Sequence, residues 1–257
     1  YLLFQIEKSA RIQKLIDHLY SRMPEIEADR AELITESYKE TEGMPVIKRR
    51  SAAFKHILEN IPITIRDNEL IVGSATKQPR SCQVFPEYSY EWLLSELDTV
   101  SQRAADPFYI SEQTKKDLRE IYPWWKGKTT SELATSYMAK ETLCAIEHNI
   151  FTPGNYFYGG VGHVTVNYGE VLEIGLAGIM AKAQKELSEM CVACEDYVTK
   201  ASFLRAVIES LQAAIDYSKR YAALAIQMAD KEGDATRRKE LRDIAAACDS
   251  ALENGAK

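Results

Sequence analysis

Apolar residues recur every three or four positions through most of this chain, which is the pattern of amphipathic helices. Such helices are predicted over about residues 10–23, 29–43, 45–61, 90–103, 111–122, 129–147, 172–187, 199–231 and 235–252. The longest of them carries an apolar stripe that includes Leu204, Leu211 and Ile215. The chain is therefore expected to be mainly α-helical.

Residues with known preferences for helix ends support several of these boundaries. Asp29 and Ser111 can each cap a helix by accepting a hydrogen bond from a free backbone amide. Thr129 and Glu132 have the spacing of a capping box, in which each side chain binds the other residue's amide. Pro123 is expected to end the helix before it, because proline lacks the N–H that a helix needs.

The stretch 61–73 breaks the helical period. Ile61, Ile63 and Ile65 alternate with other residues, and polar residues 66–69 then read as a turn before a short apolar run. Alternation of this kind predicts a short strand or hairpin. With no repeat or linker visible, the whole of residues 1–257 is expected to form a single domain.

Two glycines inside a predicted helix indicate a close contact. Gly175 and Gly178 lie within the helix whose continuous apolar stripe runs from Leu172 to Leu187. Each costs about 1 kcal/mol relative to alanine in a helix. We therefore expect another part of the backbone to approach this helix closely.

Composition and charge exclude some classes of function. The net charge of −6 argues against a sequence-independent nucleic-acid binder, which needs a basic face. No apolar run approaches the length of a membrane span. The five cysteines are too few and too scattered for a secreted disulfide framework, which favours a cytoplasmic protein.

Three further features are expected to be structural. The C-x-x-C at Cys191 and Cys194 lacks the strand–helix context of a redox motif and the extra ligands of a zinc site, so ordinary thiols near a helix end are expected. The basic run Lys48–Arg50 is expected to be a solvated helix face. Arg80 is expected to bind backbone carbonyls, although an anion site is the alternative. No metal-binding motif is present.

The most unusual stretch is Phe151–Tyr168, which holds four of the twelve glycines, five aromatic residues and one of the four histidines. Clustered glycine, proline and asparagine prevent a regular helix. The stretch is expected to form an irregular, aromatic-lined loop that presents His163. From the residues alone, two roles are equally open: His163 pins the loop by hydrogen bonding, or it binds or protonates a substrate oxygen.

Several long strings resemble the glycyl radical enzymes of the pyruvate formate-lyase group. The resemblance is carried by 27–43, by 56–73, by Pro79-Arg-Ser-Cys-Gln-Val-Phe-Pro86 and by residues 127–138. It is strongest to the coenzyme B12-independent glycerol and propane-1,2-diol dehydratases, in which a Gly-Asn-Tyr segment also leads into Gly-Val-Gly-His-Val and Tyr-Gly-x-Val-Leu. The likeness runs nearly from end to end of this chain.

The resemblance implies a fold and a reaction. The fold would be a ten-stranded α/β-barrel, of which this chain would be the largely helical N-terminal region with its short strand or hairpin. A separate radical-SAM activating enzyme would install a glycyl radical, which generates a thiyl radical on a loop cysteine. The thiyl would abstract hydrogen from a diol, and loss of water would give an aldehyde. No directly bound cofactor or metal is implied.

The resemblance also assigns residues. His163 would hydrogen-bond the substrate hydroxyls and could protonate the departing one, and Asn155 is a weaker candidate for the same pocket. The Cys-x-Glu of the thiyl loop and the radical glycine motif do not occur in residues 1–257. The chain is therefore expected to continue past Lys257, to lack a complete catalytic set, and to be inactive alone.

The resemblance thus implies the N-terminal portion of a lyase, a diol dehydratase, that is expected to be a homodimer when intact. Its expected partners are the diol, the activating enzyme and the rest of the same subunit, with no nucleic acid and no membrane. Two alternatives stay open. One is another glycyl radical lyase of the same group that cleaves C–C bonds, such as formate C-acetyltransferase, or C–N or C–S bonds. The other is a stand-alone helical scaffold without catalysis.

Overall fold

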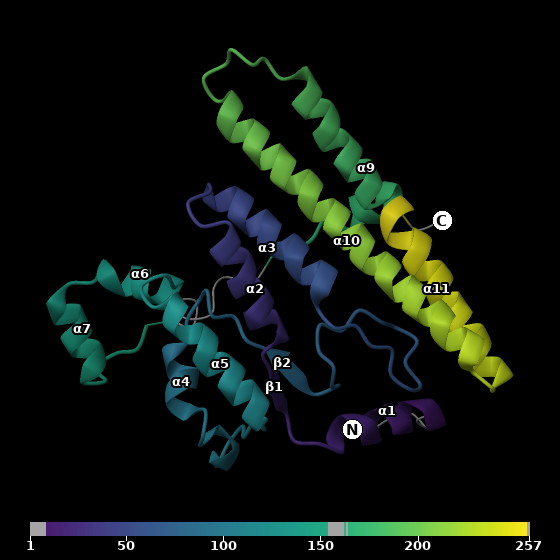
Figure 1. The fold of residues 1–257 in the computed structure, drawn as a ribbon, viewed down its shortest axis with the longest axis horizontal. Coiled ribbons are helices and arrows are strands. Elements are labelled where there is room, and N and C mark those ends of the chain that lie inside the picture. Colours follow the sequence, from purple (N-terminus) through teal and green to yellow (C-terminus); the bar gives the residue numbers. More distant parts are fainter. Residues whose placement is uncertain (1–8, 154–161, 163, 256–257) are drawn as a thin grey trace, which may run out of the picture. The chain divides into compact units, whose positions relative to one another are not determined.

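The computed structural model describes residues 9–153, 162 and 164–255. The chain divides into two compact units (Figure 1). The first unit comprises residues 1–23, 37–81 and 167–257, and the second comprises residues 24–36 and 82–166. That the two units together form a single domain stays a prediction.

The first unit is built around one long helix. Its helices are α1 (Ala10–Tyr20), α3 (Val46–Asn60), α9 (Tyr168–Glu189), α10 (Tyr197–Lys231) and α11 (Ala235–Asn254), together with the last residues of α2 (Asp29–Glu40). The 35-residue α10 packs against α3, α9 and α11 (Figure 1). Asp234 caps α11 by accepting a hydrogen bond from the amide of Arg237.

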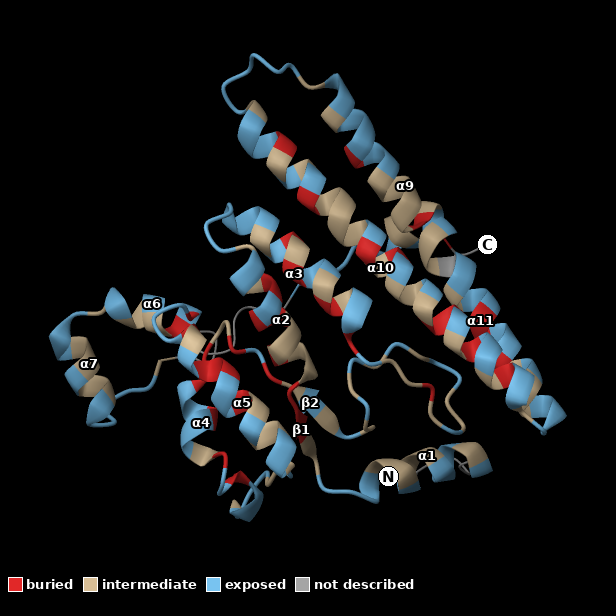
Figure 2. Ribbon diagram, viewed as in Figure 1, coloured by how far each residue is buried: buried red, intermediate tan, exposed pale blue. Residues whose placement is uncertain are grey.

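The core of the first unit lies between α10 and α11. Buried positions recur along α10 (Figure 2), and many of them are alanines, whose small side chains let α11 approach. Tyr221 of α10 and Leu241 of α11 lie in this core together with Ile65 from the irregular chain after α3. Burying a side chain such as that of Leu241 contributes roughly 1.5–3 kcal/mol.

Two glycines bring the backbones of α9 and α11 into direct contact. Gly175 interrupts α9 with φ 65° and ψ −180°, and a Cβ added there would lie 2.1 Å from the carbonyl oxygen of Glu253. Gly255 has φ 83°, and a Cβ there would lie 2.7 Å from the carbonyl oxygen of Leu172. The predicted close approach is confirmed at Gly175. At Gly178, by contrast, the added Cβ would meet the side chain of Ile174 in the same helix.

Helix α5 supplies several buried side chains to the core of the second unit. Its elements are β1 (Glu25–Glu27), β2 (Ser81–Gln83), the first residues of α2, α4 (Glu91–Glu96), the short 3-10 helix η1 (Val100–Gln102), α5 (Glu112–Trp125), α6 (Thr130–Ser136) and α7 (Lys140–Glu147). β1 and β2 form a two-stranded parallel sheet. Trp125 and Leu118 of α5 are almost fully buried. The indole Nε1 of Trp125 donates a hydrogen bond of 2.8 Å to Oγ1 of Thr35.

The hairpin predicted at 61–73 is wrong. This stretch is irregular, and the two described strands lie in β1 and β2 instead. Arginine side chains satisfy its backbone in place of a strand partner: Arg237 donates to the carbonyl oxygens of Arg66 and Glu69. Of the alternating residues Ile61 and Ile65 are buried, whereas Ile71 in the apolar run that follows is 91% exposed.

Local signals placed helix starts better than helix ends. Ser111 caps α5 and Thr129 forms the predicted capping box with Glu132. Asp29, however, is the first residue of α2 rather than its cap. The predicted stop before Pro123 is also wrong, because α5 continues through it to Trp125, where only the last turn is affected by the missing N–H.

Two predicted helices are each divided in the structure. The stretch 90–103 forms α4 and η1, and Trp92 in α4 is 49% exposed. The stretch 129–147 forms α6 and α7. At the end of α6 the amides of Tyr137 and Met138 bond three residues back, which tightens the last turn and ends the helix.

The basic run on α3 is only partly solvated. Lys48 forms a 2.9 Å ion pair with Glu209 of α10, which also accepts a hydrogen bond from Ser51. Arg49 donates to the carbonyl oxygen of Tyr38 and lies over its ring. Arg50 is exposed, as predicted. Part of the run therefore joins α3 to its neighbours in the first unit.

Among the described helices, none combines the length and apolar character needed to cross a bilayer.

Candidate functional site

The family resemblance assigns Asn155 and His163 to a substrate pocket, and both lie outside the described residues. The parts of the chain that lead into and out of their loop are described. These flanks show how the loop is attached at each end, one in each unit.

The entry to the loop follows α7. This helix ends at Glu147, and His148 occupies its C-cap with its Nδ1 2.8 Å from the carbonyl oxygen of Cys144. Asn149 then adopts a left-handed conformation with φ 55°, which turns the chain away from the helix axis. The predicted helix end at about residue 147 is confirmed, and the ring of His148 stays exposed.

The exit from the loop is held at the start of α9. The side-chain oxygen of Asn167 accepts a hydrogen bond from the amide of Glu170, and its amide group donates to the Glu170 carboxylate at 3.0 Å. A 2.8 Å ion pair with Lys182 holds the pKa of Glu170 below its ordinary value. Just before this cap, Val164 is 79% exposed. The loop therefore ends on a well-capped helix and presents apolar surface beside it.

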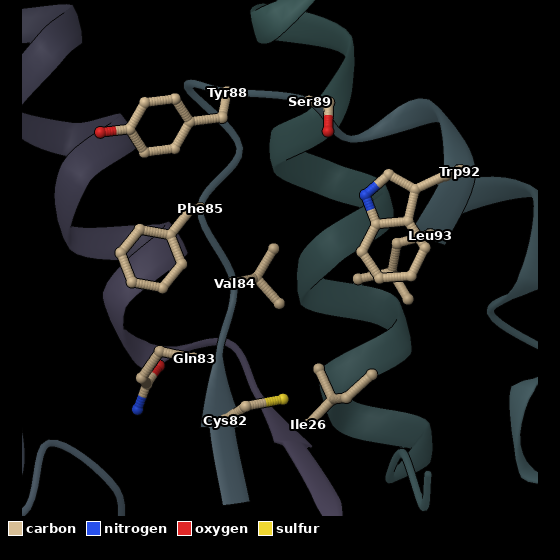
Figure 3. Close-up of a pocket in the computed structure, with 9 residues that line it drawn as sticks. All are labelled: Ile26, Cys82, Gln83, Val84, Phe85, Tyr88, Ser89, Trp92 and Leu93. Atoms are coloured by element: carbon tan, nitrogen blue, oxygen red, sulfur yellow. The ribbon is translucent and has the colours of Figure 1, made fainter. Parts of the chain in front are cut away.

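A separate cavity of about 220 Å³ lies within the second unit (Figure 3). Ile26 of β1 and Leu93 of α4 line it, together with the chain that follows β2. The thiol of Cys82 points toward Ile26, and the indole of Trp92 lies at the other end (Figure 3).

Polar contacts beneath this cavity fix the chain that follows β2. The side-chain oxygen of Gln83 accepts a hydrogen bond from the amide of Arg30, and its amide group donates to Glu27. Arg30 forms a 2.6 Å ion pair with Glu87, and its guanidinium carbon lies 3.7 Å from the centre of the Phe85 ring. The ion pair is largely shielded from water, so it holds this segment firmly.

The cavity suits an uncharged ligand rather than an acid–base reaction. Partial burial, and then the carboxylate of Glu27, raise the pKa of the Cys82 thiol, so it is protonated at neutral pH. No ionised side chain belongs to the described residues that line the cavity. Elimination of water needs a proton donor and acceptor in place. The cavity as described offers no such pair.

The sequence did not predict this cavity. The lining joins Ile26 to residues 82–93, which only the pairing of β1 with β2 brings together. Arg80, just before it, donates to the carbonyl oxygen of Arg22 and stacks near Tyr20, so the expected structural role is confirmed. Within the described residues no cluster of three potential metal ligands is found.

Comparison with known proteins defines the class of this chain. A family model described as pyruvate formate lyase-like matches residues 6–257. The chain therefore belongs to the pyruvate formate lyase-like family, and its matched relatives are glycyl radical dehydratases and lyases. The resemblance seen in the sequence is confirmed.

Two solved structures show which relatives within the family resemble this chain. A solved protein described for 1,2-propanediol dehydration in Roseburia inulinivorans is 60% identical with a TM-score of 0.93, and the match covers 96% of this chain and 30% of that one. The B12-independent glycerol dehydratase from Clostridium butyricum, solved with glycerol bound, is 52% identical with a TM-score of 0.93, over 97% of this chain and 32% of that one.

A curated relative is more distant. The (2S)-3-sulfopropanediol dehydratase of Klebsiella oxytoca is 31% identical over 243 residues, which is 93% of this chain and 29% of that protein. The chain thus spans about a third or less of the length of these relatives.

Proposed function

We propose that this chain is the N-terminal portion of a cytoplasmic glycyl radical diol dehydratase, which converts glycerol or propane-1,2-diol to an aldehyde by loss of water. The observation that carries this proposal is the identity of 60% and 52% to two proteins described for propanediol and glycerol dehydration, along nearly the whole chain. The more distant curated dehydratase acts on a sulfonated diol by its name. The two higher identities therefore favour an uncharged diol.

The radical chemistry would come from beyond the 257 residues. A thiyl radical on a Cys-x-Glu loop would abstract hydrogen from one diol carbon, after a radical-SAM activating enzyme has placed the radical on a glycine of the same subunit. This chain has neither motif. Its expected contribution is to hold the substrate, and the intact protein is expected to be a homodimer.

His163 is the proposed substrate ligand of this chain. Hydroxide is a poor leaving group, so elimination needs a proton at the departing oxygen. An imidazole that titrates near neutral pH can hydrogen-bond the hydroxyl in the ground state and donate the proton as the C–O bond breaks. Asn155, in the same loop, would add an uncharged hydrogen-bonding group that orients the second hydroxyl.

The test uses the full-length protein with its activating enzyme. His163→Ala should lower aldehyde formation by about 10²–10⁴-fold, the range for loss of a general acid. The glycyl radical signal in electron paramagnetic resonance should be unchanged, because the histidine acts after radical formation. Asn155→Ala should mainly raise KM.

His148→Ala is the matched control, since this exposed histidine caps α7 before the loop and should leave turnover unchanged. Unchanged turnover in His163→Ala would refute the role of His163. If the unaltered protein carries the radical but dehydrates neither diol, the substrate assignment would be refuted. Another glycyl radical lyase of the same group would then be favoured. Absence of the radical signal from the full-length protein would favour a scaffold.

A further inference from the structure

The turn between α9 and α10 carries two cysteines that the proposed dehydratase reaction does not use. α9 ends at Glu189, α10 begins at Tyr197, and Cys191 and Cys194 lie in the connection at the end of this helical hairpin (Figure 1). The amide of Cys194 donates a 3.1 Å hydrogen bond to the carbonyl oxygen of Cys191, which closes a tight turn around the pair. Both cysteines are exposed and neither is in a disulfide.

We propose that Cys191 and Cys194 form a reversible dithiol–disulfide pair on this turn. Two geometric observations carry the proposal. The hydrogen-bonded turn holds the two residues of the C-x-x-C together, and solvent reaches both. A disulfide needs closely spaced α-carbons, and a hydrogen-bonded four-residue turn provides that spacing. The sequence alone favoured ordinary thiols because the motif lacks a preceding strand. In the structure the hydrogen-bonded turn brings the two cysteines together without a strand.

The two thiols have unequal roles. The hydrogen bond from the Cys194 thiol, followed by those from the backbone amides of Ala193 and Cys194, lowers the pKa of Cys191. Donating that hydrogen bond, and then burial and the carboxylate of Asp196, raise the pKa of Cys194. The thiolate is the attacking species in disulfide exchange. Cys191 is therefore the attacking cysteine and Cys194 the resolving one.

The reaction partner is a disulfide, either a small thiol dimer or a disulfide on another protein. The Cys191 thiolate attacks one sulfur of the partner, forms a mixed disulfide and releases the first thiolate. Cys194 then loses its proton to solvent and attacks Cys191 Sγ, which releases the second thiolate. The two cysteines are oxidised by two electrons in total, and the partner is reduced to two thiols.

This pair is distinct from the proposed substrate loop. After its interruption at Gly175, α9 continues to Glu189, and a helix of about 14 residues spans about 21 Å. The exit of the loop at Asn167 therefore lies at the far end of α9 from the two cysteines. Exchange at the pair would fix the α9–α10 turn covalently without entering the dehydration chemistry.

Mixtures of reduced and oxidised glutathione test the proposal on the full-length protein. After quenching with N-ethylmaleimide and digestion, mass spectrometry reads the state of each cysteine. The peptide that holds both residues should change from two maleimide adducts to none, with the loss of two hydrogen atoms, as the share of oxidised glutathione rises. The exposed Cys144, which has no neighbouring cysteine in its helix, is the internal control and should show only a glutathione adduct.

Two variants separate the roles. Cys194→Ser should stop the reaction at the mixed disulfide, so that glutathione stays on Cys191. Cys191→Ser should lose the internal link. Two maleimide adducts at every glutathione ratio, or glutathione on both cysteines of the unaltered protein with no internal disulfide, would overturn the proposal.

Discussion

The backbone contact between α9 and α11 makes a sharp prediction for Gly175→Ala. The glycine has φ 65° and ψ −180°, a region that other residues occupy only at a cost of about 1–3 kcal/mol. The new Cβ would also lie 2.1 Å from the carbonyl oxygen of Glu253 and 2.5 Å from the amide nitrogen of Gly255. These are backbone atoms, so no change of rotamer relieves the clash, and overpacking adds roughly 1–3 kcal/mol.

The two contributions together amount to about 2–6 kcal/mol of local stability. Hydrogen–deuterium exchange measures the local stability of α9 and α11 in the full-length protein. A global unfolding experiment would average their stability with that of the rest of the chain. Amides in α9 and α11 should lose protection by about 30-fold to 10⁴-fold. Amides of the buried α5, in the second unit, should keep theirs.

The matched control is Gly233→Ala, in the turn between α10 and α11. A Cβ there meets nothing within 4 Å, and this glycine has no positive φ. Protection should be unchanged or slightly greater, because alanine restricts the unfolded chain. If Gly175→Ala left the exchange of α11 as in the unaltered protein, the reasoning from backbone contact would be refuted.

Two further predictions concern hydrogen bonds of the second unit. Thr35→Val should lower the free energy of unfolding by about 1–3 kcal/mol, because it removes the hydroxyl that accepts the hydrogen bond from the buried Nε1–H of Trp125. Thr35→Ser should keep most of the stability in thermal melts, and equal melting temperatures for the two variants would count against the bond. For Glu132, desolvation raises the pKa, but hydrogen bonds from Gly127 and Thr129 outweigh it and leave the pKa below its ordinary value. The folded-state pKa is the lower one, so the stabilisation is present above the ordinary value and is lost as pH falls through the folded one. Glu132→Gln should flatten the pH dependence of melting below about pH 4.5, and an unchanged slope would contradict this.

Some features that depend only on neighbouring residues could be predicted from the sequence, whereas the partners of contacts between distant residues could not. The capping box of Thr129 and Glu132 involves a four-residue stretch, and the structure confirms it. The alternating pattern in residues 61–73 was also read as a local signal for a strand. In the structure, however, Arg237 binds the backbone of this stretch, and Arg237 lies far away in the sequence. Distant pairing forms the cavity in the second unit as well.

The candidate substrate site was also predicted only in part. The unusual composition of residues 151–168 indicated a loop around His163, and the family resemblance assigned the histidine a role. The comparisons confirm the family, whereas the roles of Asn155 and His163 stay predictions. The close approach at Gly175 was predicted from the cost of glycine in a helix. Its partner in α11 could not be predicted, because nothing in the sequence around Glu253 indicates a contact with α9.

The contact between Gly175 and the end of α11 also has a consequence for biosynthesis. The first turns of α9 are braced by Glu253 and Gly255, which the ribosome adds only after all of α10 and most of α11. Chains fold as units while they emerge, and contacts between distant positions form late. The helix onto which the glycine-rich loop runs therefore cannot acquire its final brace until α11 has left the exit tunnel. A nascent chain that pauses within α10 would carry the loop on an α9 that still lacks this support.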